Sequence, residues 1–189
     1  MQTKILIRKN KYLLIVIGAF LIISSIILLF LKYYNHYEDV KIEEKSINYF
    51  FEDTDNISSD NEKNNSIEDN EEIIDYIAIL EIPKINLKKG LVSTSSYYNN
   101  VNYNIQILDN STMPNDNSNL ILASHSGNSW ISFFKYLNQL SNKDISYIYY
   151  GNIKYIYEVM DIYEVDKTGQ IILNKYKDYN VLTMITCKD

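Results

Sequence analysis

The pattern of hydrophobic and polar residues divides the 189-residue chain into three unlike segments. Residues 13–31 are an apolar run without any charge, in which Ser24 and Ser25 are the only polar side chains. As a helix rising about 1.5 Å per residue, this run extends roughly 28 Å, close to the hydrocarbon thickness of a bilayer. The pattern therefore predicts a transmembrane helix over residues 13–31.

Residues 1–12 carry only basic charges, at Lys4, Arg8, Lys9 and Lys11. A basic flank stays in the cytoplasm, which predicts a cytoplasmic tail, a single-pass anchor in the cell membrane and an extracytoplasmic remainder. The alternative is a cleaved signal peptide, whose apolar region is shorter and is followed by small residues. Here Lys32, Tyr33 and Tyr34 follow the apolar run, which favours an uncleaved anchor.

Residues 32–75 contain fourteen acidic side chains and many Asn and Ser residues. Such a composition buries too little apolar surface to offset chain entropy, so we predict an acidic flexible linker. A short apolar group within it (Ile47, Tyr49, Phe50 and Phe51) is compatible with packing on the domain that follows, at a place the pattern does not define.

The remaining segment, residues 76–189, shows short runs rich in strand formers and is predicted to be a mainly β domain. The predicted strands are 76–82, 105–108, 119–124, 145–150, 153–158, 159–165 and 180–186. Gly151 and Asn152 predict a hairpin turn, because Gly tolerates a positive φ there. One helix is predicted over 129–141, capped by Asn128 or Ser129, from the spacing of Ile131, Phe134, Leu137 and Leu140. Many short strands with one helix suggest a small closed barrel or a sandwich.

The composition argues against several classes of function. A net charge of −6 and a pI near 5.0 argue against nucleic-acid binding, which usually shows a basic domain. A single cysteine excludes a disulfide framework and a multi-cysteine zinc site, and two histidines argue against a His-rich metal site. We therefore expect no metal and no cofactor.

Two residues could carry chemistry. Cys187 is a lone thiol without an intramolecular partner, although free cysteines are often simply buried. His125 ends an apolar strand within Ser-His-Ser-Gly, although a structural histidine is the plainer interpretation. A cysteine and a histidine brought together from two strand ends form a typical nucleophilic pair, but their spacing of 62 residues does not show that they meet.

Five segments, in order, resemble the sortase family of membrane-anchored cysteine transpeptidases of Gram-positive bacteria. They are LEIPKINL (80–87), ILASHSG (121–127), FFKYLNQLSNKD (133–144), IKYIYEV (153–159) and LTMITC (182–187), the last resembling the T-L-x-T-C motif with Met184 in place of Leu.

The resemblance implies an eight-stranded closed β-barrel with one or two short helices. It also implies that Cys187 attacks a Thr–Gly bond in an LPXTG-like sorting signal and that His125 protonates the leaving amine as general acid. An amine acceptor, either a peptidoglycan cross-bridge or a pilin lysine, would then resolve the acyl-enzyme. Thr186 matches a family position near the bound substrate.

One feature departs from the family pattern. The family carries a catalytic arginine on the eighth strand, whereas Arg8 is the only arginine here and the sequence stops at Asp189. We therefore expect a C-terminally truncated sortase without its eighth strand. Three interpretations stay open: an inactive remnant, a working transpeptidase that tolerates or recruits the missing strand, and a non-catalytic, membrane-tethered binding module.

Overall fold

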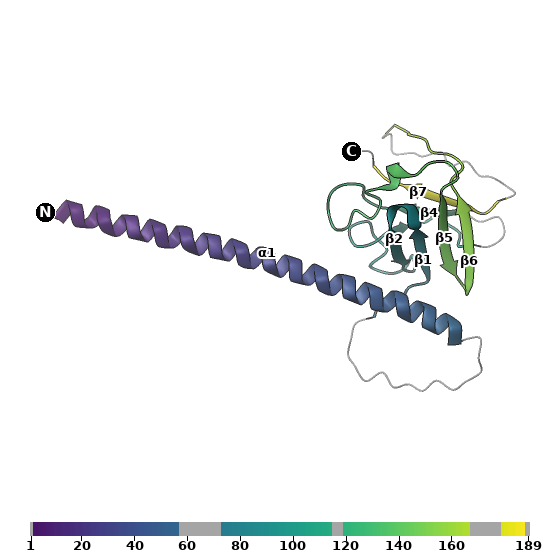
Figure 1. Cartoon of the computed structure of the whole chain (residues 1–189), viewed down its shortest axis with the longest axis horizontal. Coiled ribbons are helices and arrows are strands. Elements are labelled where there is room, and N and C mark those ends of the chain that lie inside the picture. The colour runs from purple at the N-terminus through teal and green to yellow at the C-terminus, as the bar shows by residue number, and fades with distance from the viewer. Residues whose placement is uncertain (1, 57–72, 115–118, 167–178, 188–189) are drawn as a thin grey trace. The chain divides into compact units, whose positions relative to one another are not determined.

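The computed structural model describes residues 2–56, 73–114, 119–166 and 179–187, with element order α1, β1, η1, β2, β3, β4, η2, β5, β6 and β7 (Figure 1). The chain divides into two compact units, Met1–Ile42 and Glu43–Asp189. Each unit is considered by itself below.

Helix α1 (Gln2–Asn56) supplies all of the first unit. Its large apolar side chains between Leu13 and Leu31 are exposed on every side of the helix. Among the described residues, α1 is the one helix long and apolar enough to cross a membrane. Length and composition therefore agree with the predicted span.

The last turns of α1 belong to the second unit and differ from the predicted linker. Residues 32–56 are helical, whereas the sequence predicted a flexible chain, and residues 57–72 of that linker lie outside the described residues. The helix is held by a face with i, i+3, i+4, i+7 spacing, which a composition averaged over 44 residues conceals. The side chains on that face that contact the domain are Glu43, Ser46, Ile47, Phe50 and Phe51.

The larger sheet has four antiparallel strands in the order β2-β1-β5-β6. They are β1 (Ala78–Ile82), β2 (Leu87–Leu91), β5 (Ile145–Tyr150) and β6 (Ile153–Glu158). Gly151 (φ 55°) and Asn152 (φ 63°) form the two-residue turn between β5 and β6, as predicted. Positive φ at both positions is the type I′ geometry that matches the twist of hairpin strands.

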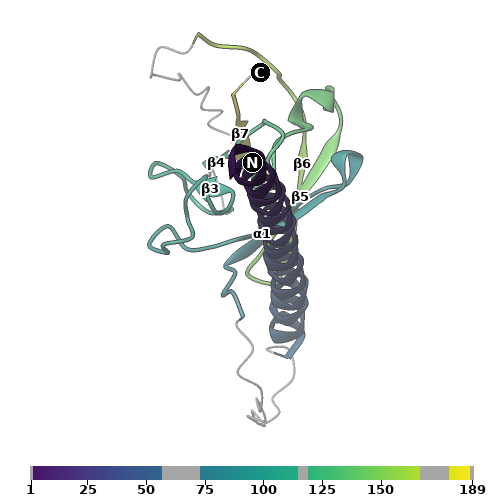
Figure 2. The ribbon, with the colours of Figure 1, turned by 90° about the vertical axis from the view of Figure 1, so that its left-hand side faces the viewer.

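The smaller sheet has three strands in the order β3-β4-β7. They are β3 (Gln106–Ile107), β4 (Asn119–Ala123) and β7 (Val181–Ile185). Strand β3 pairs antiparallel with β4, and β4 pairs parallel with β7. Figure 2 shows these three labels gathered together, apart from β5 and β6.

Both sheets contribute to one hydrophobic core. Its fully buried members include Leu80 and Ile148 from the larger sheet and Leu120 and Leu122 from the smaller one. Phe134, from the connection after β4, is also fully buried there. The domain is thus mainly β, as predicted, with its side chains interlocked between two sheets.

Two sequence predictions about elements were wrong, and one strand was missed. Residues 159–165 form no strand, although Val159 exchanges two backbone hydrogen bonds with the Lys143–Asp144 turn. Residues 129–141 form successive tight turns and only one short 3₁₀ helix, η2 (Leu137–Gln139). Strand β2 was not predicted, because the consecutive lysines in LKKGL obscure its alternation.

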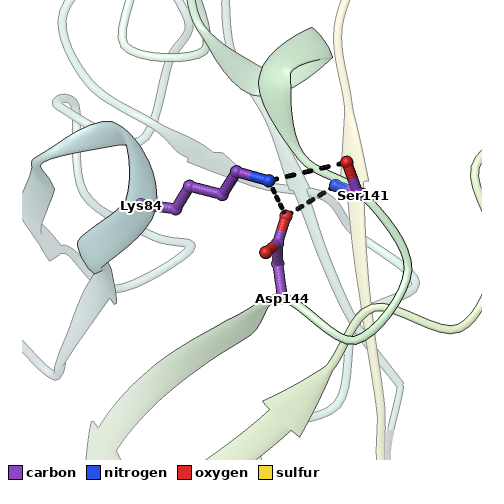
Figure 3. A network of polar contacts seen from close by, with 3 residues as sticks. All are labelled: Lys84, Ser141 and Asp144. Carbon is purple, nitrogen blue, oxygen red and sulfur yellow. Dashed lines mark hydrogen bonds and ion pairs between the residues drawn. The ribbon is translucent and has the colours of Figure 1, made fainter.

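An exposed polar network ties η1 (Pro83–Ile85) to the turn before β5 (Figure 3). Lys84 Nζ lies 2.6 Å from Asp144 Oδ2, and the same oxygen accepts a bond from the Ser141 backbone N–H at 2.6 Å. These two donors lower the pKa of the Asp144 carboxyl.

Candidate functional site

The parallel pairing of β4 and β7 brings the two predicted catalytic residues to one end of the smaller sheet. Every pair in this register, from Asn119↔Val181 to Ala123↔Ile185, is 62 residues apart. His125 and Cys187 are also 62 residues apart, and each lies two positions beyond the last pair. Since neighbouring strands lie about 4.8 Å apart, these two residues leave the sheet side by side.

Side-chain alternation places them on the same face as well. Leu122 and Met184 pack in the core, so residues at the intervening positions of both strands face the other way. If the same alternation continues past the strand ends, His125 and Cys187 lie on that other face. An imidazole and a thiol on one face of adjacent strand ends can exchange a proton during nucleophilic chemistry.

Three hydrogen bonds fasten the end of β4 to the end of β7. The Ser124 backbone N–H donates to Ile185 O at 3.2 Å. The Thr186 hydroxyl donates to Ser124 O at 2.8 Å, and the Ser126 hydroxyl donates to Cys187 O at 2.5 Å. The residues on either side of His125 are thus bonded directly to the Cys187 segment, which fixes the separation of the two backbones.

The connection after β4 holds His125 from its other side. The Phe134 backbone N–H donates to His125 O at 3.0 Å, and the Phe134 ring is fully buried in the core. This bond also explains why residues 129–141 form no helix. The Phe134 N–H donates to His125 O, outside the segment, and so is not available for a bond within a helix. The hydroxyls of Ser129 and Ser132 bond to each other at 3.0 Å and close the turn between.

Cys187 is a free, exposed cysteine, so the alternative of an inert buried thiol does not describe it. His125 is partly exposed. Thr186, expected near the substrate, uses its hydroxyl to bond the main chain of β4. Sequence reasoning missed Ser126, although the Ser-His-Ser pattern places a second hydroxyl beside the histidine.

The residues that the structure describes contain no group of three or more His, Cys, Asp or Glu side chains that could hold a metal ion. This end of the smaller sheet carries a thiol, an imidazole and neighbouring hydroxyls, from Cys187, His125, Ser126 and Thr186.

This arrangement defines a β-domain with a candidate cysteine-histidine site. A protein-family model described as the Sortase domain matches residues 80–189, which is more than half of the chain and includes His125 and Cys187. The chain belongs to the sortase family. A comparison with curated proteins finds no match.

Solved structures agree on the fold. A Clostridium perfringens sortase D5 transpeptidase is 24% identical, with 79% of this chain and 91% of that chain covered and a TM-score of 0.57. Sortase A from Corynebacterium diphtheriae, a lid mutant, is 22% identical over 61% of this chain, with a TM-score of 0.52. Sortase C-1 from Actinomyces oris is 26% identical over 61% of this chain, with a TM-score of 0.53. The chain spans 62% of the length of the Corynebacterium protein and 65% of that of the Actinomyces protein.

Proposed function

We propose that this chain is a sortase-type transpeptidase in which Cys187 is the nucleophile and His125 is the general acid. The observation that supports the proposal is the β4–β7 register, in which Ala123 pairs with Ile185 two positions before His125 and Cys187. Family membership supports the same assignment, because the matched region contains both residues.

The first half-reaction forms a thioester. The Cys187 sulfur attacks the threonine carbonyl carbon of an LPXTG-like signal, and the bond between that carbon and the glycine nitrogen breaks. His125 donates a proton to the departing amine. The segment that begins with the glycine leaves as the free amine, and the surface protein stays bound to the Cys187 sulfur through its threonine carbonyl.

The second half-reaction transfers the acyl group to an amine. The nitrogen of a peptidoglycan cross-bridge or a pilin lysine attacks the thioester carbon, a new amide forms and the sulfur leaves as thiolate. The proton lost by the amine returns to the imidazole, which restores both groups for the next turnover.

Helix α1 would hold this domain at the cell membrane through residues 13–31. The exposed apolar surface of that segment and the basic residues before it support a single span with the N-terminus in the cytoplasm. Substrates that emerge from the same membrane would then reach the domain without free diffusion through the wall.

The decisive test is capture of the acyl-enzyme. The full chain in detergent micelles is mixed with an LPXTG-containing peptide, and its intact mass is measured. We expect a mass increase equal to the acyl fragment, lost in Cys187→Ala and strongly slowed in His125→Ala. Thr186→Val, which removes the hydroxyl but keeps the shape, tests whether that residue also contributes to peptide binding.

The outcomes separate the open interpretations. Peptide binding without any acylation by the wild-type chain would indicate a membrane-tethered binding module. Neither binding nor acylation would contradict the proposal altogether. Acylation followed by hydrolysis only, even with excess amine, would retain the nucleophile and overturn the transfer step.

A further inference from the structure

A buried lysine joins three distant segments of the second unit. Among the residues that the structure describes, Lys89 in β2 is the one charged residue that is buried. Its Nζ lies 2.6 Å from Glu43 Oε2, in the last turns of α1, and 4.3 Å from the centroid of the Phe133 ring. Phe133 belongs to the connection between β4 and β5, which also carries His125. We call these interactions of Glu43, Lys89 and Phe133 the Lys89 contact.

The burial of the ammonium gives the Phe133 ring a defined place. A desolvated cation is stable only where other partners replace its water. Glu43 supplies a carboxylate oxygen, and the negative face of the aromatic ring supplies a second partner. The attraction between a cation and a ring face is stronger when the cation is desolvated. Phe133 is therefore held by its ring face as well as by apolar packing at the edge of the core.

The next residue, Phe134, is fixed in the core and bonded to His125. Its ring is fully buried, and its backbone N–H donates to His125 O at 3.0 Å. That N–H belongs to the planar peptide group that joins Phe133 to Phe134. The two rings thus anchor this peptide group at both of its ends. Its orientation decides whether the N–H points at the His125 carbonyl.

The bond from Phe134 acts on His125 itself, whereas β7 holds the residues on either side. The Ser124 N–H bonds Ile185 O, and the Ser126 hydroxyl bonds Cys187 O. Between those two anchors the peptide groups that flank His125 could still rotate. The side-chain rotamers open to a residue depend on its backbone angles, so such a rotation would turn the imidazole.

We propose that Lys89 and Phe133 are positioning residues for His125, and that Glu43 keeps Lys89 in place. The ammonium holds the Phe133 ring, the ring orients the peptide group before Phe134, and that group holds the His125 carbonyl. That the imidazole then reaches the departing amine rests on the proposed function. The dependence of the His125 backbone on the Lys89 contact does not. The last turns of α1 are thereby part of the support of the candidate site.

Amide hydrogen exchange of the full chain in detergent micelles tests this support without any reaction. The Phe134 amide is followed in the wild-type chain, in Phe133→Leu and in the double variant Glu43→Leu with Lys89→Met. The double variant removes both charges, so it leaves no ion buried alone. We expect exchange at Phe134 to become about tenfold faster in both variants, because the bond to His125 O opens more often.

A second contact of the same kind provides the matched control. Lys88 Nζ lies 4.8 Å from the centroid of the Phe51 ring, and Phe51 packs in the other hydrophobic cluster with Ile79 and Tyr149. Phe51→Leu therefore removes a similar contact that does not lead to His125. We expect the Phe134 amide to keep its wild-type exchange rate in this variant, once rates are normalised to the most protected amides of β4.

A pair of substrates tests the consequence for the proposed chemistry. The scissile amide of an LPXTG-containing peptide needs a proton on its leaving nitrogen. The thioester analogue, with thioglycolate in place of glycine, transfers its acyl group to the Cys187 sulfur and releases a thiolate without that proton. We expect Phe133→Leu and the double variant to acylate about tenfold more slowly with the amide and at the wild-type rate with the thioester. A change that only lowered stability or disturbed Cys187 would slow both reactions.

The outcomes separate this inference from the proposed function. Faster Phe134 exchange in both variants, with an unchanged control, supports the Lys89 contact even if the wild-type chain does not acylate. Unchanged exchange overturns it whatever the acylation rates, and an effect in Phe133→Leu alone overturns the part of Lys89. In an active chain, an unchanged ratio of amide to thioester rates in both variants would also overturn it. Equal slowing of both substrates in His125→Ala would instead contradict the general acid of the proposed function.

Discussion

The ion pair between Glu43 and Lys89 offers the sharpest test of how the last turns of α1, within the second unit, pack on its sheet. Lys89 Nζ lies 2.6 Å from Glu43 Oε2, and the two side chains are only 11% and 21% exposed. The ammonium also lies 4.3 Å from the centroid of the Phe133 ring. We expect Lys89→Met, which keeps the aliphatic stem, to leave a half-buried carboxylate without its cation.

The expected loss in the free energy of unfolding follows from the distance between the two charges and their burial. Two charges 2.6 Å apart attract by about 6 kcal/mol at an effective dielectric constant of about 20. Desolvation of the two ions offsets most of that gain, but removing one partner leaves the other ion's desolvation uncompensated, at about 3 kcal/mol. The double variant Glu43→Leu with Lys89→Met should therefore lie within about 1 kcal/mol of wild type.

Urea unfolding of the full chain in detergent micelles measures both values. Trp130, the only tryptophan, reports on the second unit by its fluorescence. Lys84→Met is the matched control, because the Lys84–Asp144 pair has the same 2.6 Å separation but is exposed, and it should cost less. A loss below about 1 kcal/mol in Lys89→Met would refute the reasoning, as would a double variant whose loss equals the sum of the single losses.

Three further outcomes are expected. Ser126→Ala should slow acylation about fivefold to tenfold, because it removes the hydrogen bond to the Cys187 carbonyl, and Ser126→Thr should restore the rate. The rate of acyl-enzyme formation at several pH values measures both effects. Equal rates in the wild-type chain and the two variants would contradict this expectation. Gly90→Ala would drive a Cβ into the Tyr76 ring and should cost about 1–3 kcal/mol in urea unfolding, and less in a Tyr76→Leu background. Burial, with a contribution from the charge of Glu43, raises the pKa of the Tyr76 phenol. The contribution of Tyr76 to stability should therefore be complete below about pH 10 and fall as the pH rises toward the pKa of the folded state. In Tyr76→Phe this alkaline loss should disappear from the urea midpoint.

The strands and the hairpin could be predicted from the sequence because their signals are local. Aromatic and β-branched residues mark β5 and β6, and Gly151-Asn152 marks the turn between them. The turns at 129–141 could not be predicted, because the apolar spacing of this segment fits a helix as well as it fits the observed run of tight turns. The bond from Phe134 to His125, which decides between them, joins different segments.

The helical extension of α1 was missed for a related reason. Composition over residues 32–75 is dominated by acids, and only the residues that contact the domain carry the helical face. Ile47, Phe50 and Phe51 gain their stabilisation from Tyr76, Ile79, Val92 and Tyr149, which lie far along the chain. Local propensity is a weak guide when tertiary packing supplies most of the helix stability.

The candidate site shows most clearly which features could not be predicted from the sequence. His125 and Cys187 could be named from their residue types, but a spacing of 62 residues has no meaning until β4 and β7 are known to pair in parallel with that offset. A slip of one residue would turn Cys187 to the opposite face from His125, since side chains alternate along a strand. The Ser126 and Thr186 hydroxyls bond across this pair of strands just beyond the last paired residues and so oppose such a slip. His125 and Cys187 therefore alternate along the chain with Ser124, Ser126 and Thr186, whose hydrogen bonds hold the register of the two strands.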